Sequence, residues 1–161
     1  MPKSVFAAAV SFVLFLILSA PALTDTIHQG KVVKITDGDT LTLLVNDEQL
    51  KIRLSDIDTP KRKQPFGTRA KQALSELAFG KQARVIEVTT DRYGRIVGRV
   101  FVDGIDVNRE LVAQGYAWVY RKYSKDAELL RLEAEAKQKG LGLWADPNPI
   151  PPWEWRRGQR D

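Results

Sequence analysis

The stretch that decides the fold is KVVKITDGDTLTLLVNDEQLKIRLSDIDTP, residues 31–60. Three runs within it have the composition or the apolar–polar alternation of half-buried strands: 31–36, 40–43 and 49–54. The pairs Asp37-Gly38 and Asn46-Asp47, which separate these runs, are turn signals. Because each connection is so short, the stretch predicts three consecutive antiparallel strands in a meander.

The chain that follows the meander supplies one helix and then two more strands. A helix is predicted from residue 68 to 79, where Gly80 follows it, and strands are predicted over 83–90 and 96–102 with a turn at 91–95. Strand counting alone leaves an SH3-like barrel open. The helix between the third and fourth strands favours an α+β fold, a five-stranded OB-fold barrel. Two further helices are predicted, giving three in all: 107–114 and 125–139.

Both ends of the sequence differ from this central part. Residues 1–22 contain Lys3, an apolar run of about 14 residues and a small-x-small ending, the pattern of a cleaved signal peptide. An uncleaved membrane anchor is the competing interpretation. After cleavage we expect a short tail at 23–29, the domain at 30–145 and a Pro/Trp-rich extended strap at 146–161. The protein is then exported, periplasmic or secreted, with no membrane span left after processing.

Composition narrows the chemistry before any motif is considered. The 161 residues carry a formal net charge of +5, contain no cysteine and have a single histidine, His28. Thiol nucleophiles, zinc–thiolate sites and multi-histidine metal sites are therefore excluded. A basic balance favours polyanionic partners such as nucleic acid, an anionic membrane surface or a wall polymer. We expect a monomer.

Three short stretches carry candidate chemistry: residues 37–40, 53–60 and 91–95. Each by itself is an ordinary turn or loop. Asp39 and Asp58, however, fall at the ends of adjacent strands of the meander, where their carboxylates can converge. Carboxylate and carbonyl oxygens suit calcium, and arginine is the best partner for phosphate because it is planar and always charged. The pattern predicts a metal-and-phosphate site.

The sequence resembles the staphylococcal nuclease family from about residue 30 to residue 157. The motifs DGDT at 37–40, DTP at 58–60 and DRYGR at 91–95 occur in that family's order and approximate spacing. The resemblance implies an OB-fold barrel that hydrolyses the phosphodiester bonds of DNA and RNA, single-stranded or duplex, with Ca²⁺.

The same resemblance implies roles for individual residues. Asp39 and Asp58 match the metal-binding carboxylates, and Thr59 matches a backbone-carbonyl ligand. Arg53 and Arg95 match the two phosphate clamps, and Lys61 occupies the general-base position. The substrate-binding residues are matched by Tyr93, Trp118 and Tyr120. Trp118 and Tyr120 have a second interpretation as packing residues at the barrel edge.

Lys61 departs from the family pattern, which places a glutamate at this position to orient or deprotonate the attacking water. A charged lysine accepts no proton, and losing a positioned general base typically costs about 10²- to 10⁴-fold in rate. Three hypotheses follow. The protein is a slowed or rewired nuclease, in which Asp56 or metal-bound hydroxide serves as the base. It is a non-catalytic nucleic-acid binder that uses the basic loop at residues 61–63. Or the barrel binds another anionic polymer or a protein.

Overall fold

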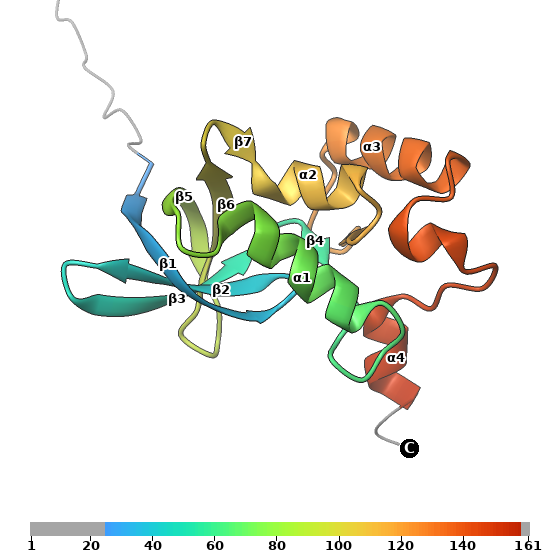
Figure 1. The fold of residues 1–161 in the computed structure, drawn as a ribbon, viewed down its shortest axis with the longest axis horizontal. Coiled ribbons are helices and arrows are strands. Elements are labelled where there is room, and N and C mark those ends of the chain that lie inside the picture. Colours follow the sequence, from blue (N-terminus) through green and yellow to red (C-terminus); the bar gives the residue numbers. More distant parts are fainter. Residues whose placement is uncertain (1–24, 159–161) are drawn as a thin grey trace, which may run out of the picture.

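The computed structural model describes residues 25–158, and the expected signal peptide at residues 1–22 lies outside them. Five strands form a barrel: β1 (Ile27–Asp37), β2 (Thr40–Val45), β3 (Glu48–Leu54), β5 (Gln82–Thr90) and β6 (Ile96–Val102). They are hydrogen-bonded in the order β3-β2-β1-β5-β6, and a parallel pairing between β3 and β6 closes the ring. The predicted OB-fold barrel is therefore confirmed (Figure 1).

Tight turns set the register of the meander, as the sequence predicts. In the β1–β2 pair Asp37 lies opposite Thr40, and in the β2–β3 pair Val45 lies opposite Glu48. Only Asn46 and Asp47 connect β2 to β3, and both have positive φ, at 46° and 68°. Two residues of this backbone conformation match the right-handed twist of the flanking strands, which is why this turn type favours asparagine and aspartate.

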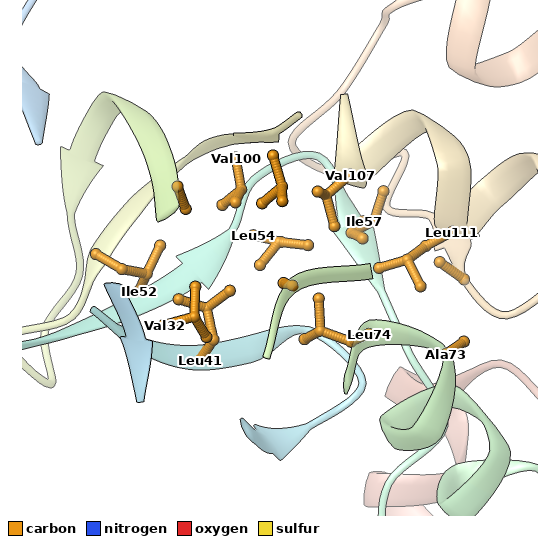
Figure 2. Packing of buried hydrophobic residues seen from close by; sticks show 14 of the residues in the cluster. Val32, Leu41, Ile52, Leu54, Ile57, Ala73, Leu74, Val100, Val107 and Leu111 are labelled. Carbon is orange, nitrogen blue, oxygen red and sulfur yellow. The ribbon is translucent and has the colours of Figure 1, made fainter. Parts of the chain in front are cut away.

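The barrel interior is packed with aliphatic side chains. Figure 2 shows strand residues gathered against residues of two helices: Val32, Leu41, Ile52, Leu54 and Val100 with Leu74 and Leu111. All seven have no exposed surface. Burying such a side chain stabilises the fold by about 1.5–3 kcal/mol. The apolar alternation in residues 49–54 therefore correctly predicts which face of this strand packs inside the barrel.

Four α-helices occur among the described residues, instead of the three expected: α1 (Gly67–Ala78), α2 (Val107–Ala113), α3 (Ala127–Gln138) and α4 (Pro152–Gly158). Asp106 caps α2 by accepting a hydrogen bond from the Arg109 N–H, and Asp126 caps α3 in the same way through Glu128 and Leu129. Three two-residue strands and a 3₁₀ turn complete the structure: β4 (Ile57–Asp58), β7 (Ile105–Asp106), β8 (Trp118–Val119) and Gly142–Ala145.

The expectation of an extended strap over residues 146–161 is wrong for residues 152–158, which form α4. A seven-residue helix has too little periodicity to be recognised, and the proline at its first position also reads as a loop signal. Helix α4 lies near the loop that precedes α1 (Figure 1). Gln64 of this loop donates a hydrogen bond from its side chain to the carbonyl of Ile150, just before α4, at 2.6 Å.

The other end of the domain also differs from the expected boundaries. Strand β1 begins at Ile27, within the stretch expected to be a tail, and pairs with β5 from Ile27 opposite Ile86 onward. His28 is consequently part of the barrel, with its Nε2 2.8 Å from a carboxylate oxygen of Glu87. No helix in residues 25–158 is long and apolar enough to cross a bilayer.

Candidate active site

Asp39 lies in the turn between β1 and β2, and its carboxylate has no exposed surface. One oxygen, Oδ2, accepts hydrogen bonds from the Thr59 backbone N–H and hydroxyl, each at 3.0 Å, and Oδ1 accepts one from the Thr40 hydroxyl at 3.1 Å. A Cβ on the preceding Gly38 would lie 2.7 Å from both Ala70 of α1 and the Thr59 hydroxyl. The turn therefore needs glycine to pack this close to α1 and Thr59.

Asp58 reaches the same place from β4. Asp56 has a φ of 66°, which ends the regular geometry of β3 before β4 begins. Strand β4 pairs with β8, placing Asp58 opposite Trp118, and the Asp58 side chain is 1% exposed. The predicted convergence of Asp39 and Asp58 is observed. It arises from the backbone break at Asp56 together with the β4–β8 pairing, not from regular strand ends.

Two cations from the same part of the chain hold this pair of carboxylates. Nη2 of Arg53 lies 3.3 Å from Asp39 and 3.4 Å from Asp58, and the guanidinium also donates to the carbonyls of Leu54 and Ile57. Nζ of Lys61 lies 2.9 Å from Asp39 and 3.4 Å from Asp58. The Arg53 side chain, which is 13% exposed, is thus fixed by four acceptors.

A third cation comes from α4. Nη2 and Nη1 of Arg156 lie 2.7 Å and 3.3 Å from the two oxygens of Asp58. Sequence reasoning missed this contact. Arg156 stands 98 residues from Asp58, and the strap expected over residues 146–161 gave no reason to place this side chain against Asp58.

The electrostatics follow from these contacts. Burial raises the pKa of Asp39, but the positive charges of Arg53 and Lys61 outweigh it and hold the pKa well below its usual range. The pKa of Asp37, which lies 3.9 Å from Lys61, is raised by burial and by the nearby Asp39 charge. Burial lowers the pKa of Lys61, yet the three carboxylates raise it overall. Lys61 is therefore an ammonium at neutral pH.

The residues fit calcium in their chemistry but not in their present arrangement. Asp37, Asp39 and Asp58 offer hard oxygen ligands, which calcium prefers. All three, however, face the Nζ of Lys61 within 3.9 Å, so the ammonium stands at the position a cation would take. No group of three or more His, Cys, Asp or Glu side chains in residues 25–158 is arranged to hold a metal ion. A metal ion bound by all three carboxylates would therefore have to displace the Lys61 ammonium.

Arg95 and Tyr93 lie on the β5–β6 hairpin. Arg95 bonds to the Asp91 carboxylate through Nε and Nη2, both at 2.8 Å, and its guanidinium lies 5.6 Å from the Tyr93 ring centre. Tyr93 is 68% exposed. Among the described residues, neither contacts Asp39 or Asp58. The structure therefore brings together Asp39, Arg53, Asp58, Thr59 and Lys61, and leaves the hairpin residues as a separate group.

Trp118 and Tyr120 form part of an aromatic cluster. Trp118 is 8% exposed and packs edge-on against Trp144 and Trp153, at centroid distances of 4.4 Å and 5.7 Å. Tyr120 stacks on Trp153 at 5.2 Å, with the rings 2° from parallel. The packing interpretation therefore suits Trp118, while half-buried Tyr120 is shared between packing and surface. Trp153 also anchors α4 beside the site.

The fold and these motifs define a nuclease-like OB domain, and comparison with known proteins agrees. Residues 51–146 match the family model described as staphylococcal nuclease homologue, so the chain belongs to the staphylococcal nuclease family.

Named relatives span almost the whole chain. A micrococcal nuclease of Shigella flexneri is 42% identical over 172 aligned positions, covering 99% of this chain and 98% of the relative. Protein ParB of Escherichia coli is 44% identical and an uncharacterized endonuclease of Escherichia coli is 43% identical, covering 88% and 91% of this chain and 85% and 95% of their own lengths. These relatives support nuclease activity on nucleic acid.

Proposed function

We propose that this protein is an endonuclease that hydrolyses phosphodiester bonds of DNA and RNA at the Asp39–Asp58 site. The observation that carries the proposal is the pair of carboxylates, 0% and 1% exposed, held by three cations, two from residues 53–61 and one from α4. A purely structural site has no need of so many buried charges, since desolvating them is costly. The endonuclease relatives support the same reaction class.

The residues of the chain have separate roles in this proposal. Arg53 stabilises the negative charge that develops on the phosphorus oxygens, and it acts without reorganisation because four acceptors already fix it. Asp39 and Asp58 orient the cations. Lys61 binds phosphate but accepts no proton from water, so we propose a slower reaction than a carboxylate at this position would allow.

We propose calcium as the metal of the reaction, with Asp39, Asp58 and the Thr59 carbonyl as its ligands. Bound calcium would supply a Lewis acid for the phosphoryl oxygen. Because the Lys61 ammonium lies among the same carboxylates, calcium binding requires that the lysine side chain leave. We therefore propose a calcium affinity lower than that of a variant without this charge.

We also propose that the protein works outside the cytoplasm as a monomer. The support is the signal-peptide pattern of residues 1–22, with cleavage expected after Ala22. Expression of the full sequence in a bacterium, followed by N-terminal sequencing and light scattering of the recovered protein, tests both points. A mature chain that still begins at Met1, or a stable dimer, contradicts the respective point.

Digestion of plasmid DNA and of RNA tests the proposed activity. Wild type and Lys61→Glu are each assayed with calcium, with magnesium and with EDTA. Cleavage by wild type that EDTA abolishes supports the proposal. An inert wild type beside an active Lys61→Glu variant contradicts it and indicates a site that only binds.

A non-catalytic nucleic-acid-binding module is the second candidate function. The favouring observation is again Lys61, whose ammonium fills the cation position with a group that attracts phosphate without activating water. For this candidate, we expect salt-dependent binding of an oligonucleotide by wild type without cleavage in any metal. If neither variant cleaves nor binds DNA at low salt, both candidate functions fail. The hypothesis that the barrel binds another anionic polymer or a protein is then the one left.

A further inference from the structure

Arg156 is the most exposed of the three cations on the buried carboxylate pair. Its side chain is 35% exposed, against 27% for Lys61 and 13% for Arg53. Arg53 directs its donors to backbone carbonyls and carboxylates, and Lys61 lies among three carboxylates. Arg156 has Asp58 as its one hydrogen-bond partner in residues 25–158. A guanidinium has five N–H donors, so three have no hydrogen-bond partner in the described residues.

The fold holds Arg156 in place through the first turn of α4. Trp153 stacks on Tyr120, and Pro152 is buried. Residues three apart on a helix share a face, so the docking of Trp153 turns Arg156 toward Asp58. The guanidinium then meets the carboxylate with both terminal nitrogens, at 2.7 Å and 3.3 Å. A group fixed in this way loses little further freedom when it binds a ligand.

Charge balance shows what Arg156 contributes. The site contains three carboxylates, of Asp37, Asp39 and Asp58, and three cations, of Arg53, Lys61 and Arg156. The two sets cancel. Without Arg156 the other five side chains carry a formal charge of 2 − 3 = −1, so Arg156 makes this set less repulsive to a phosphodiester.

We propose that Arg156 is a substrate-binding residue that contacts a nucleic-acid phosphate with the donors not used by Asp58. The proposal rests on the proposed function and extends it, because neither the family motifs nor the spacing of the sequence assigns a role to this arginine. Asp58 then also positions a phosphate-binding guanidinium supplied from 98 residues away.

Oligonucleotide binding without turnover tests this inference. Fluorescence anisotropy of a labelled single-stranded DNA, in EDTA and at several salt concentrations, is measured for wild type, Arg156→Ala, Arg156→Lys and the matched control Arg157→Ala, whose exposed arginine is the next residue of α4. Losing a charge-assisted hydrogen bond typically weakens binding about 10- to 100-fold. We expect this loss for Arg156→Ala, with a salt slope shallower by about one unit.

Arg156→Lys should recover part of the affinity, because it keeps the charge but not the paired donors, and Arg157→Ala should stay within about threefold of wild type. Near-UV circular dichroism, which reports the packing of the aromatic cluster that contains Trp153 and Tyr120, shows whether α4 remains docked in each variant. If Arg156→Ala displaces α4, the test is instead whether Arg156→Lys binds the oligonucleotide more weakly than Arg157→Ala. Equal affinity of these two variants would then overturn the inference. Binding by Arg156→Ala as tight as wild type, or tighter, overturns the inference, and tighter binding would identify Arg156 as a competitor of the substrate.

The inference and the proposed function fail separately. If no variant cleaves in calcium but Arg156→Ala binds more weakly, hydrolysis is contradicted and the role of Arg156 stands. If wild type cleaves and Arg156→Ala binds and cleaves equally well, the role of Arg156 is contradicted and the function stands. If wild type neither binds the oligonucleotide at low salt nor cleaves in calcium, both are overturned.

Discussion

The ammonium nitrogen of Lys61 lies 2.9 Å from Oδ2 of Asp39, the same oxygen that accepts both the backbone N–H and the hydroxyl of Thr59. Arg53 approaches this oxygen as well, at 3.3 Å. Oδ2 is therefore saturated with donors inside a carboxylate that has no exposed surface. A metal ion gains this ligand only by displacing one of those donors, and the lysine side chain is the one that can move without unfolding a turn.

Calcium binding should consequently depend on Lys61. We expect little change in the Tm of wild type on adding millimolar calcium, and a clear rise for Lys61→Gln. A ligand at 100 times its Kd stabilises a fold by about 2.7 kcal/mol, which is about 5–10 °C for a domain of this size. Lys63→Gln, an exposed lysine of the same loop, is the control. Equal calcium shifts for wild type and Lys61→Gln would show that the ammonium and the metal do not compete.

Asp39→Asn should destabilise the protein. The change removes the carboxylate that pairs with Arg53 and Lys61, and breaking a buried pair typically costs about 3–5 kcal/mol. Lys61 is partly exposed, so we expect a loss near 3 kcal/mol in the free energy of unfolding from urea denaturation. Asp37→Asn, whose contact with Lys61 is 3.9 Å long, should cost less than about 1 kcal/mol. A gain in stability for Asp39→Asn would mean that repulsion between the carboxylates dominates the site.

Arg95→Ala tests the role expected for the hairpin. If Arg95 leaves Asp91 to bind the reacting phosphate, its removal should lower the cleavage rate about 10²- to 10³-fold, the effect of deleting one charge-stabilising donor. Arg92→Ala, on the same hairpin and exposed, should change the rate much less. Cleavage of a short DNA under single-turnover conditions provides the measurement, and an unchanged rate for Arg95→Ala contradicts the assignment.

Acid stability should depend on Glu133, a carboxylate 1% exposed that accepts the Val119 N–H and an Nη of Arg121. Burial raises its pKa, but the hydrogen bonds from Arg121 and Val119 and the Lys137 charge lower it overall. A carboxyl with a lowered pKa stabilises the fold at pH above the unfolded value, near 4.3, and this stabilisation is lost as the pH falls through the folded value.

Glu133→Gln should therefore lower the free energy of unfolding at pH 7 by about 1–3 kcal/mol and flatten its decline below about pH 4.5. Thermal unfolding from pH 7 to pH 3 measures both effects. The matched control is Glu135→Gln on the exposed side of α3, whose partner Arg131 is 52% exposed. Parallel pH profiles for wild type and Glu133→Gln would show that ionisation of Glu133 does not contribute to the pH dependence of stability.

Local signals account for what the sequence predicted of the fold. Alternation in residues 49–54 marked the buried face because a strand places successive side chains on opposite sides. The Asn46-Asp47 turn was recognisable because positive φ restricts residue choice. Helix α4 was missed because its seven residues depend on tertiary contacts, such as the stack of Trp153 on Tyr120, and not on a periodic pattern.

The candidate site divides in the same way. That Asp39, Asp58 and Arg53 lie together could be predicted, because each belongs to a short motif at the end of a strand of the meander. The Lys61 substitution was visible, but its position among three carboxylates was not, because that depends on where the loop after Thr59 turns back. The Asp58–Arg156 contact joins distant segments, and a single sequence carries no local trace of such a contact.

The Asp58–Arg156 contact also forms late in synthesis, because its two residues are made at different times. Ribosomes add about 5–20 residues per second, so the 98 residues between Asp58 and Arg156 correspond to about 5–20 s of synthesis. At the start of that interval only β1 to β3 of the barrel strands have been made, together with Asp58, and β5, β6 and Arg156 follow. The charge-balanced site can therefore form only after α4, at the end of the domain, has been made and has docked.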